Sequence, residues 1–248
     1  LSADVLSPWL GGWRATMVFV GALSVVMAIV WVLVFRGGTA GQTASTEQNA
    51  KPKSFLEVLK LPEIWCLSLY YAFFAAGFYS VLSLLPSLLA ERNIANGGVY
   101  TSVIPFTMIA SNVLGGTLSD RVGRENVLMV CLVAFGLIMP GLLMSDGVVL
   151  GVLLALAGLF AGPIMPVASA LPSEMRRVGQ VSAGTAMGIF FMIGNTGAFL
   201  GPMLAGWSTE KFQSPWPSFI IFTILALLSP VLIWKLKALL KTPQLDHG

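Results

Sequence analysis

Residues 178–209 read VGQVSAGTAMGIFFMIGNTGAFLGPMLAGWST, a stretch of 32 residues without Asp, Glu, Lys or Arg. A helix rises about 1.5 Å per residue, so roughly 20 apolar residues are enough to cross the hydrocarbon core of a bilayer. A helix that touches water needs a polar face, and this stretch places no charge on any side. We therefore interpret it as a membrane-spanning helix.

Six further stretches have the same character, and all 14 basic and 11 acidic residues of the chain fall outside the seven. The six are residues 15–35, 64–90, 93–119, 126–145, 147–173 and 212–234. With 56% hydrophobic residues and a mean hydropathy of +0.84, the chain has too little polar surface to be solvated as a globule in water. We predict an all-α, polytopic membrane protein with seven transmembrane helices, and its partner is the lipid bilayer.

Residues that could carry out chemistry are scarce. His247 is the only histidine and stands one residue from the C-terminus. Cys66 and Cys131 each lie inside an apolar stretch without a second Cys or His nearby, which is typical of small buried hydrophobic residues. No set of catalytic residues for an intramembrane enzyme is present, so we expect no catalytic residue, metal or cofactor. No loop combines basic and aromatic residues in the manner of a nucleic-acid site, so we expect no nucleic-acid partner.

The basic residues of the loops predict an orientation. When the ends of the seven spans are assigned alternately to two sides, eleven of the 14 Lys and Arg residues collect on one side. They are Arg36, Lys51, Lys53, Lys60, Arg121, Arg124, Arg176, Arg177, Lys235, Lys237 and Lys241, against Arg14, Arg92 and Lys211 on the other. Short loops rich in Lys and Arg face the cytoplasm. We expect an integral protein of the inner or plasma membrane with a cytoplasmic C-terminus.

Composition also divides the chain into segments. Residues 1–35 are expected to hold the tail of a preceding helix, up to residue 14, and one transmembrane helix. Residues 36–54 are rich in Gly, Thr, Ser, Gln and Ala, have no apolar period, and are typical of a flexible cytoplasmic linker. A short amphipathic interfacial helix is expected after it, from Phe55 to Leu61. Residues 55–241 then form a block of six spans, and residues 242–248 a cytoplasmic tail.

The loop between the third and fourth predicted spans is short and must turn sharply. Gly116 would permit close helix contact, and Gly123 would permit a tight backbone turn. Asp120 can accept hydrogen bonds from exposed backbone N–H groups at a neighbouring helix start. Arg121 and Arg124 can anchor in the cytoplasmic interface. Together these residues are expected to form a tight cytoplasmic turn between two packed helix ends.

Residues 116–125 read GTLSDRVGRE, which resembles the signature G-x-L-x-D-R-x-G-R-[KR] of the major facilitator superfamily. Only Glu125, where that family favours a basic residue, departs from it. Weaker resemblances lie at Ser7 to Arg14, at Pro172, Glu174 and Arg177, and at Gly197 to Pro202 with Gly206. The resemblance implies that the chain corresponds to helices six to twelve of such a transporter, with residues 55–241 as its C-terminal half. It also implies missing N-terminal helices as a partner, and a charge network of Asp120, Arg124, Glu174 and Arg177 that favours the outward-facing state.

The same resemblance makes the second and fifth spans the helices that line a substrate cavity. The second span carries the aromatic residues Tyr70, Tyr71, Phe74 and Tyr79, and the fifth carries Pro163 in a Gly-Pro pair that can bend the helix. The second set of candidates consists of Asn112 and Asn195, each followed by closely spaced glycines. For the two asparagines, hydrogen bonding between helices is the first interpretation and contact with substrate the second.

The function expected on these grounds is secondary active transport of a small solute by alternating access. None of the seven predicted spans contains Asp, Glu, Lys or Arg. A proton site or a counter-ion for a charged substrate is therefore expected in the upstream helices. A seven-helix membrane receptor and a non-transporting membrane scaffold stay open as alternatives. A retinal protein is disfavoured because no span contains the Lys that its Schiff base needs.

The orientation predicts how single cysteines react in intact cells. A Cys at position 51 or 237 should resist a membrane-impermeant thiol reagent, because both positions belong to the basic, cytoplasmic side. A Cys in place of Asn93, at the opposite end of the second span, should be labelled. Rapid labelling of position 51 from outside the cell would contradict the orientation.

Overall fold

The computed structural model describes residues 7–35, 53–94, 97–175 and 177–241. It contains two compact units, residues 1–50 and residues 51–248. Most of the predicted linker, the predicted C-terminal tail with His247, and Lys51 lie outside the described residues. In the first unit, the short helix α1 (Ser7–Trp9) is followed by α2 (Trp13–Phe35), which is apolar and long enough to cross a membrane.

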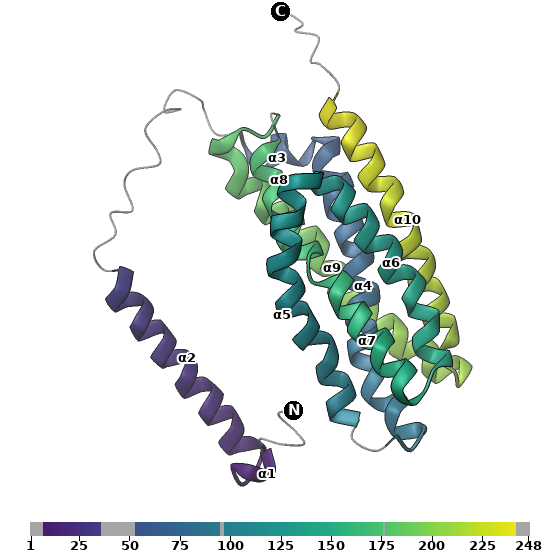
Figure 1. Cartoon of the computed structure of the whole chain (residues 1–248). Coiled ribbons are helices and arrows are strands. Elements are labelled where there is room, and N and C mark those ends of the chain that lie inside the picture. Colours follow the sequence, from purple (N-terminus) through teal and green to yellow (C-terminus); the bar gives the residue numbers. More distant parts are fainter. Residues whose placement is uncertain (1–6, 36–52, 95–96, 176, 242–248) are drawn as a thin grey trace, which may run out of the picture. The chain divides into compact units, whose positions relative to one another are not determined.

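The described residues of the second unit form helices joined by short turns. Its elements are α3 (Phe55–Leu59), α4 (Pro62–Glu91), α5 (Gly97–Val122), α6 (Arg124–Met144), α7 (Gly147–Ala161), α8 (Ile164–Glu174), the 3-10 turn η2 (Gln180–Ser182), α9 (Ala183–Phe212) and α10 (Trp216–Lys241). The helices of this unit run side by side, with α10 along α4 and α6 (Figure 1). With α7 and α8 counted as one span, the described part of the chain has seven candidate membrane spans. The predicted fold class is confirmed.

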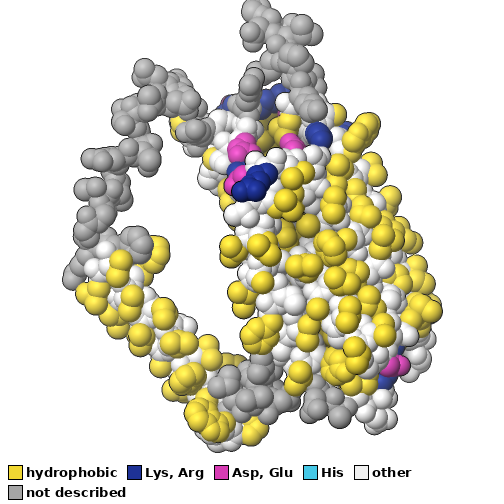
Figure 2. Space-filling view, viewed as in Figure 1, with side chains coloured by type: hydrophobic (Ala, Val, Ile, Leu, Met, Phe, Trp, Pro, Cys, Tyr) yellow, Lys and Arg dark blue, Asp and Glu magenta, His cyan; other side chains and the backbone are white. Residues whose placement is uncertain are grey.

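Charged side chains on the second unit lie near its two ends. Figure 2 shows hydrophobic side chains over the middle of the visible face, with Lys, Arg, Asp and Glu toward the ends. The long apolar side chains along the helices are exposed in large numbers, as in the case of Val113, Leu137 and Ile224. A surface of this kind matches a hydrocarbon solvent rather than water.

The expected interfacial helix is shorter than its predicted range. Ser54 caps α3 by accepting a hydrogen bond from the Glu57 backbone N–H at 3.4 Å, and the Ser54 N–H donates to Glu57 Oε2 at 2.8 Å. This reciprocal pair satisfies two N–H groups that the first turn leaves free. Pro62, which lacks an N–H, then begins α4 at a position where no helical hydrogen bond is lost.

A close helix contact joins α4 to α9 through glycines. A Cβ atom built on Gly197 would stand 2.0 Å from the Ala72 carbonyl oxygen, and one on Gly201 would stand 2.4 Å from the Ala76 carbonyl oxygen. Two helix backbones meet directly here, with only hydrogen atoms on the α9 side. In lipid, where apolar surface gains little by leaving the solvent, such close van der Waals contact is a main source of helix association.

The fifth span breaks where the Gly-Pro pair predicts a bend. α7 ends at Ala161 and α8 begins at Ile164, so Gly162 and Pro163 separate two helical segments. Pro163 packs against α5, because a Cβ built on Gly115 would lie 2.3 Å from the Pro163 Cβ. The Ser111 hydroxyl of α5 donates to the Gly158 carbonyl at 3.2 Å and adds a polar link between α5 and α7. The two segments are therefore both held by α5.

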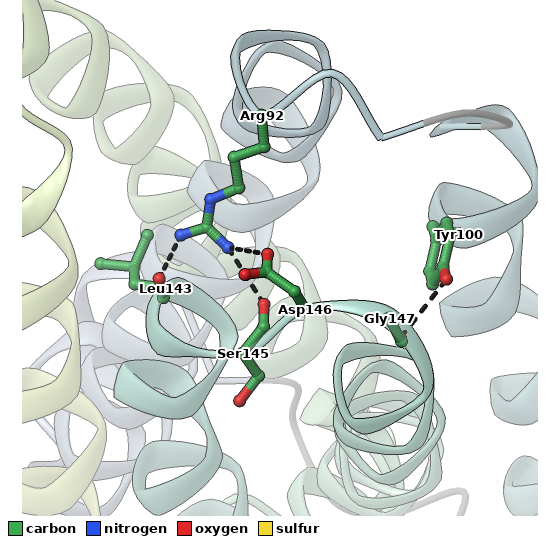
Figure 3. A network of polar contacts seen from close by, with 6 residues as sticks. All are labelled: Arg92, Tyr100, Leu143, Ser145, Asp146 and Gly147. Carbon is green, nitrogen blue, oxygen red and sulfur yellow. Dashed lines mark hydrogen bonds and ion pairs between the residues drawn. The ribbon is translucent and has the colours of Figure 1, made fainter.

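At the end of α4, an arginine closes the end of the bundle opposite the signature loop. Arg92 donates to the carbonyls of Leu143 and Ser145 and forms an ion pair of 3.0 Å with Asp146, as Figure 3 shows. The last carbonyls of α6 lack partners within their own helix, so a cationic donor is favourable there. Arg92 therefore connects the end of α4 to the turn between α6 and α7.

The glycine contact yields a matched stability test. Gly197→Ala should lower the free energy of unfolding by about 1 to 3 kcal/mol, because the new methyl group collides with backbone and cannot be relieved by a side-chain rotation. Gly206→Ala on the same helix, where no atom lies within 4 Å of the added Cβ, should be neutral or slightly stabilising. Thermal unfolding in detergent measures both. Equal melting temperatures for the two variants would contradict the contact.

Candidate functional site

The signature loop turns in a single residue. α5 ends at Val122 and α6 begins at Arg124, and Gly123 between them has a φ of +96°. A side chain is strained in that backbone conformation, so glycine is the residue that suits it. The Gly123 N–H donates to the Ser119 carbonyl at 3.0 Å and closes the last turn of α5. The turn therefore places Asp120, in the last turn of α5, close to Arg124, the first residue of α6.

Arg124 joins the ends of three helices. Its guanidinium lies 3.0 Å from Glu174 at the end of α8 and 3.5 Å from Asp120 at the end of α5. The Arg124 side chain is 23% exposed, whereas Asp120 and Glu174 are 68% and 53% exposed. One partly buried cation therefore neutralises two carboxylates that still face outward from the unit. The carboxylates stay free to accept further donors.

Arg177 forms a second, separate ion pair. It lies 3.1 Å from Glu63 in the first turn of α4, and the Glu63 side chain is only 3% exposed. Glu63 Oε2 has no hydrogen-bond partner among the described residues. The segment before α3 reaches the same place, because the Lys53 N–H donates to the Ser182 hydroxyl at 2.9 Å and its ammonium donates to the Arg177 carbonyl.

The single predicted network is therefore two clusters in this unit. Asp120, Arg124 and Glu174 form one, and Arg177 pairs with Glu63 instead. Sequence reasoning missed Glu63 because it stands beside Pro62, just before a charge-free stretch, where a polar interfacial position was expected. A Glu in the first turn of an apolar helix was the available signal.

Two other residues of the signature loop, Arg121 and Gly116, lie outside this ion-pair cluster. Arg121 is exposed and takes part in no ion pair among the described residues. Gly116 makes no close helix contact within the described residues, since no atom of another helix lies within 4 Å of a Cβ built there. Gly115 makes that contact instead, because its Cβ position points at Pro163. Adjacent helical residues point about 100° apart, so a shift of one residue exchanges an inward face for an outward one.

Three of the aromatic cavity candidates lie in the interior of the unit. Tyr70, Tyr71 and Phe74 are at most 5% exposed. The Tyr71 ring lies 5.0 Å from Phe190 of α9, and the Phe74 ring lies 5.3 Å from Phe135 of α6, measured between ring centroids. These rings fill the space between α4, α6 and α9, so the prediction that they line a cavity is wrong for this unit. Their helical spacing served core packing.

The remaining cavity candidates divide by exposure. Pro163 is buried against α5, so it bends the fifth span without lining an open surface. Tyr79 is 42% exposed. Asn112 and Asn195 are both exposed, and neither side-chain amide bonds to another helix among the described residues. The first interpretation of the two asparagines, hydrogen bonding between helices, does not hold within this unit.

The six spans and the signature loop agree with a known family. The family model described as Major Facilitator Superfamily matches residues 93–246, which is more than half of the chain. The chain belongs to the major facilitator superfamily. A comparison with curated proteins gives no match. Members of this superfamily are membrane transporters and not enzymes, so the function of this protein is membrane transport.

Among the described residues of this superfamily member, no group of three or more His, Cys, Asp or Glu residues could hold a metal ion. Cys66 and Cys131 are buried and unpaired. Polar groups of the described residues include the ion pairs at the signature-loop end and the exposed amides of Asn112 and Asn195.

The buried ion pair yields a stability prediction for this superfamily member. Arg177→Gln should cost about 1 to 3 kcal/mol, since it leaves the Glu63 carboxylate buried beside a neutral partner, and the partial exposure of Arg177 moderates the loss. Arg121→Gln removes an exposed arginine without an ion pair and should change stability by less than about 0.5 kcal/mol. The double variant Glu63→Gln/Arg177→Gln should recover part of the loss. Thermal unfolding in detergent measures all three, and equal effects of the two arginine variants would refute the role of the pair.

Proposed function

We propose that this protein is a secondary active transporter that moves a small solute by alternating access, and that residues 55–241 supply one of its two six-helix halves. The observation that carries the proposal is the position of Asn112 and Asn195. Asn112 lies near the middle of α5, and Asn195 lies near the middle of α9. Both side-chain amides are exposed and have no hydrogen-bond partner among the described residues.

An amide in that position is costly in lipid. Transfer of an unpaired amide from water to an apolar medium costs roughly 2 to 7 kcal/mol, so polar residues at mid-membrane face a water-filled cavity or a polar partner. In transporters built from two halves, substrates bind near the bilayer midplane between the halves. Asn112 and Asn195, with Tyr79 on α4, are the residues we propose for this surface.

The broken fifth span supports movement. α8 is only 11 residues long, starts after the Gly162–Pro163 break and ends at Glu174, which pairs with Arg124. A change in the bend at Pro163 would therefore move Glu174 relative to Arg124 and Asp120. We propose that this cluster stabilises the state in which the cytoplasmic ends of the two halves are closed, with the exposed carboxylates meeting the other half. The buried pair of Glu63 and Arg177 would hold the start of α4 during that movement.

Cysteine accessibility tests this proposal without a known substrate. In the full protein with Cys66 and Cys131 replaced by Ala, Asn112→Cys and Asn195→Cys should react with a hydrophilic thiol reagent. Ile224→Cys on α10, an exposed apolar position, should not react, because lipid would cover it. If neither asparagine position reacts from either side of the membrane, no aqueous cavity is present and alternating access between halves is refuted.

The proposed role of the Asp120, Arg124 and Glu174 cluster can be tested by the same labelling. Asp120→Asn removes one charge from an exposed ion pair worth up to about 1 kcal/mol, so reaction of Asn112→Cys from the cytoplasmic side should rise about twofold to fivefold. Glu91→Asn removes a carboxylate at the end of α4, which lies at the end of the bundle opposite the signature loop. This control variant should leave the labelling rate of Asn112→Cys unchanged. An unchanged rate in Asp120→Asn would reduce the signature loop to a structural turn.

A further inference from the structure

A groove of about 520 Å³ lies on the outside of the unit between α4, α9 and α10. Its volume falls in the range of sites for small organic ligands, about 300 to 1,000 Å³. The floor contains Ala72 and Ala76 of α4, and the walls include Leu204 of α9 and Ile221 of α10. Leu204 is 50% exposed and Ile221 52% exposed, so the walls are open to whatever surrounds the protein.

The groove lies beside the glycine contact between α4 and α9. Gly197 and Gly201 bring α9 against the small residues of α4, and both glycines also border the groove. Larger side chains of the same helices, among them Phe73 of α4 and Leu200 of α9, also border the groove beside this contact. The backbone contact therefore borders the groove, and side chains of α4, α9 and α10 form the rest of its lining.

The length and direction of the groove match one leaflet of a bilayer. Its lining follows α9 from Thr196, near the middle of the helix, to Phe212, its last residue. Sixteen residues of helix cover about 24 Å, and half of a bilayer including its headgroup region is roughly 20 Å thick. A groove of this kind starts near the midplane and opens at the interface opposite the signature loop.

The open end of the groove carries a cation on aromatic rings. The Lys211 ammonium lies 4.8 Å from the centroid of Trp207 and 5.9 Å from that of Phe212, and both rings line the groove. Among the described residues, no carboxylate forms an ion pair with Lys211. Trp at a membrane interface with a nearby Lys is the usual surrounding of a lipid headgroup.

A serine one turn from Lys211 has an unused hydroxyl. Ser208 lines the groove and is 6% exposed, and its Oγ has no hydrogen-bond partner among the described residues. A buried hydroxyl without a partner costs about 1 to 3 kcal/mol, so an acceptor supplied from the groove would be favourable. The neighbouring Ser218 already donates to the Ala205 carbonyl at 3.3 Å.

We propose that this groove binds one glycerophospholipid, with an acyl chain between α4, α9 and α10 and its phosphate at Lys211. The order of groups along α9 matches the order of groups in the lipid. Lys211 meets the phosphate, Ser208 donates to an ester carbonyl after a rotation of its side chain, and the apolar lining from Leu204 to Thr196 holds the chain. Neither a polypeptide helix nor a second copy of this chain offers an anionic group followed by an ester and an alkyl chain in that order.

Native mass spectrometry of the full protein tests the proposal. The protein is purified in mild detergent and titrated with phosphatidylglycerol, or with diacylglycerol of the same chains. Ile221→Trp fills the groove and should abolish the tightest phosphatidylglycerol adduct. Ile224→Trp is the matched control, because Ile224 has nearly the same exposure, 51%, but lies outside the groove lining. It should keep the adduct.

The headgroup is tested separately. Lys211→Gln should weaken phosphatidylglycerol about fivefold, since one basic residue near the membrane surface contributes about 1 kcal/mol toward an anionic lipid. Diacylglycerol, which lacks the phosphate, should bind equally to wild type and to this variant. Gel filtration and circular dichroism confirm that each variant is folded.

Three results would overturn the proposal. Equal loss of lipid in the Ile221→Trp and Ile224→Trp variants would show a nonspecific lipid shell. Equal affinity of the wild type for phosphatidylglycerol and diacylglycerol would show that the lipid phosphate is not bound at Lys211. Disulfide formation between two copies of an Ile221→Cys variant would show that protein, not lipid, covers the groove.

Discussion

The direct backbone contact between α4 and α9 is the interaction on which the rest of the unit depends. In a bilayer, the lipid tails solvate apolar side chains as well as a protein interior does, so burial alone does not hold helices together. Gly197 and Gly201 let α9 reach the carbonyls of Ala72 and Ala76, where dispersion contacts are densest. This contact positions the aromatic core on one side of the two helices and the lipid-sized groove on the other.

Charge is confined to the ends of this frame, and there it connects elements that are distant in the sequence. At the signature-loop end, Arg124 links α5, α6 and α8, while Arg177 reaches back to Glu63 at the start of α4. At the other end, Arg92 connects α4 to the turn after α6. The Glu63 carboxylate is buried, whereas Asp120, Glu174 and Asp146 are exposed, so the pair of Glu63 with Arg177 is the costliest of these to break. The middle of the spanning helices carries no Asp, Glu, Lys or Arg.

The site residues show where sequence reasoning succeeded and where it failed. The one-residue turn at Gly123 and the break at Pro163 follow from local backbone chemistry, which the sequence displays directly. Tyr71 and Phe74 failed as cavity residues because a charge-free helix gives no sign of which face meets protein and which meets lipid. Amphipathic periodicity, the usual guide to a buried face, is absent when both environments are apolar.

By itself, the sequence determined the class of the protein, the number and approximate limits of its spans and the place of the signature turn, because charge and length alone decide what can cross a bilayer. Only the tertiary structure decided which side of each helix packs against other helices and which side is exposed. It buried Glu63 with Arg177, made Gly115 rather than Gly116 the contact residue, and left Asn112 and Asn195 exposed. These outcomes depend on how each helix is rotated about its axis. That rotation is set by the packing of small residues from segments far apart in the chain, which no local pattern records.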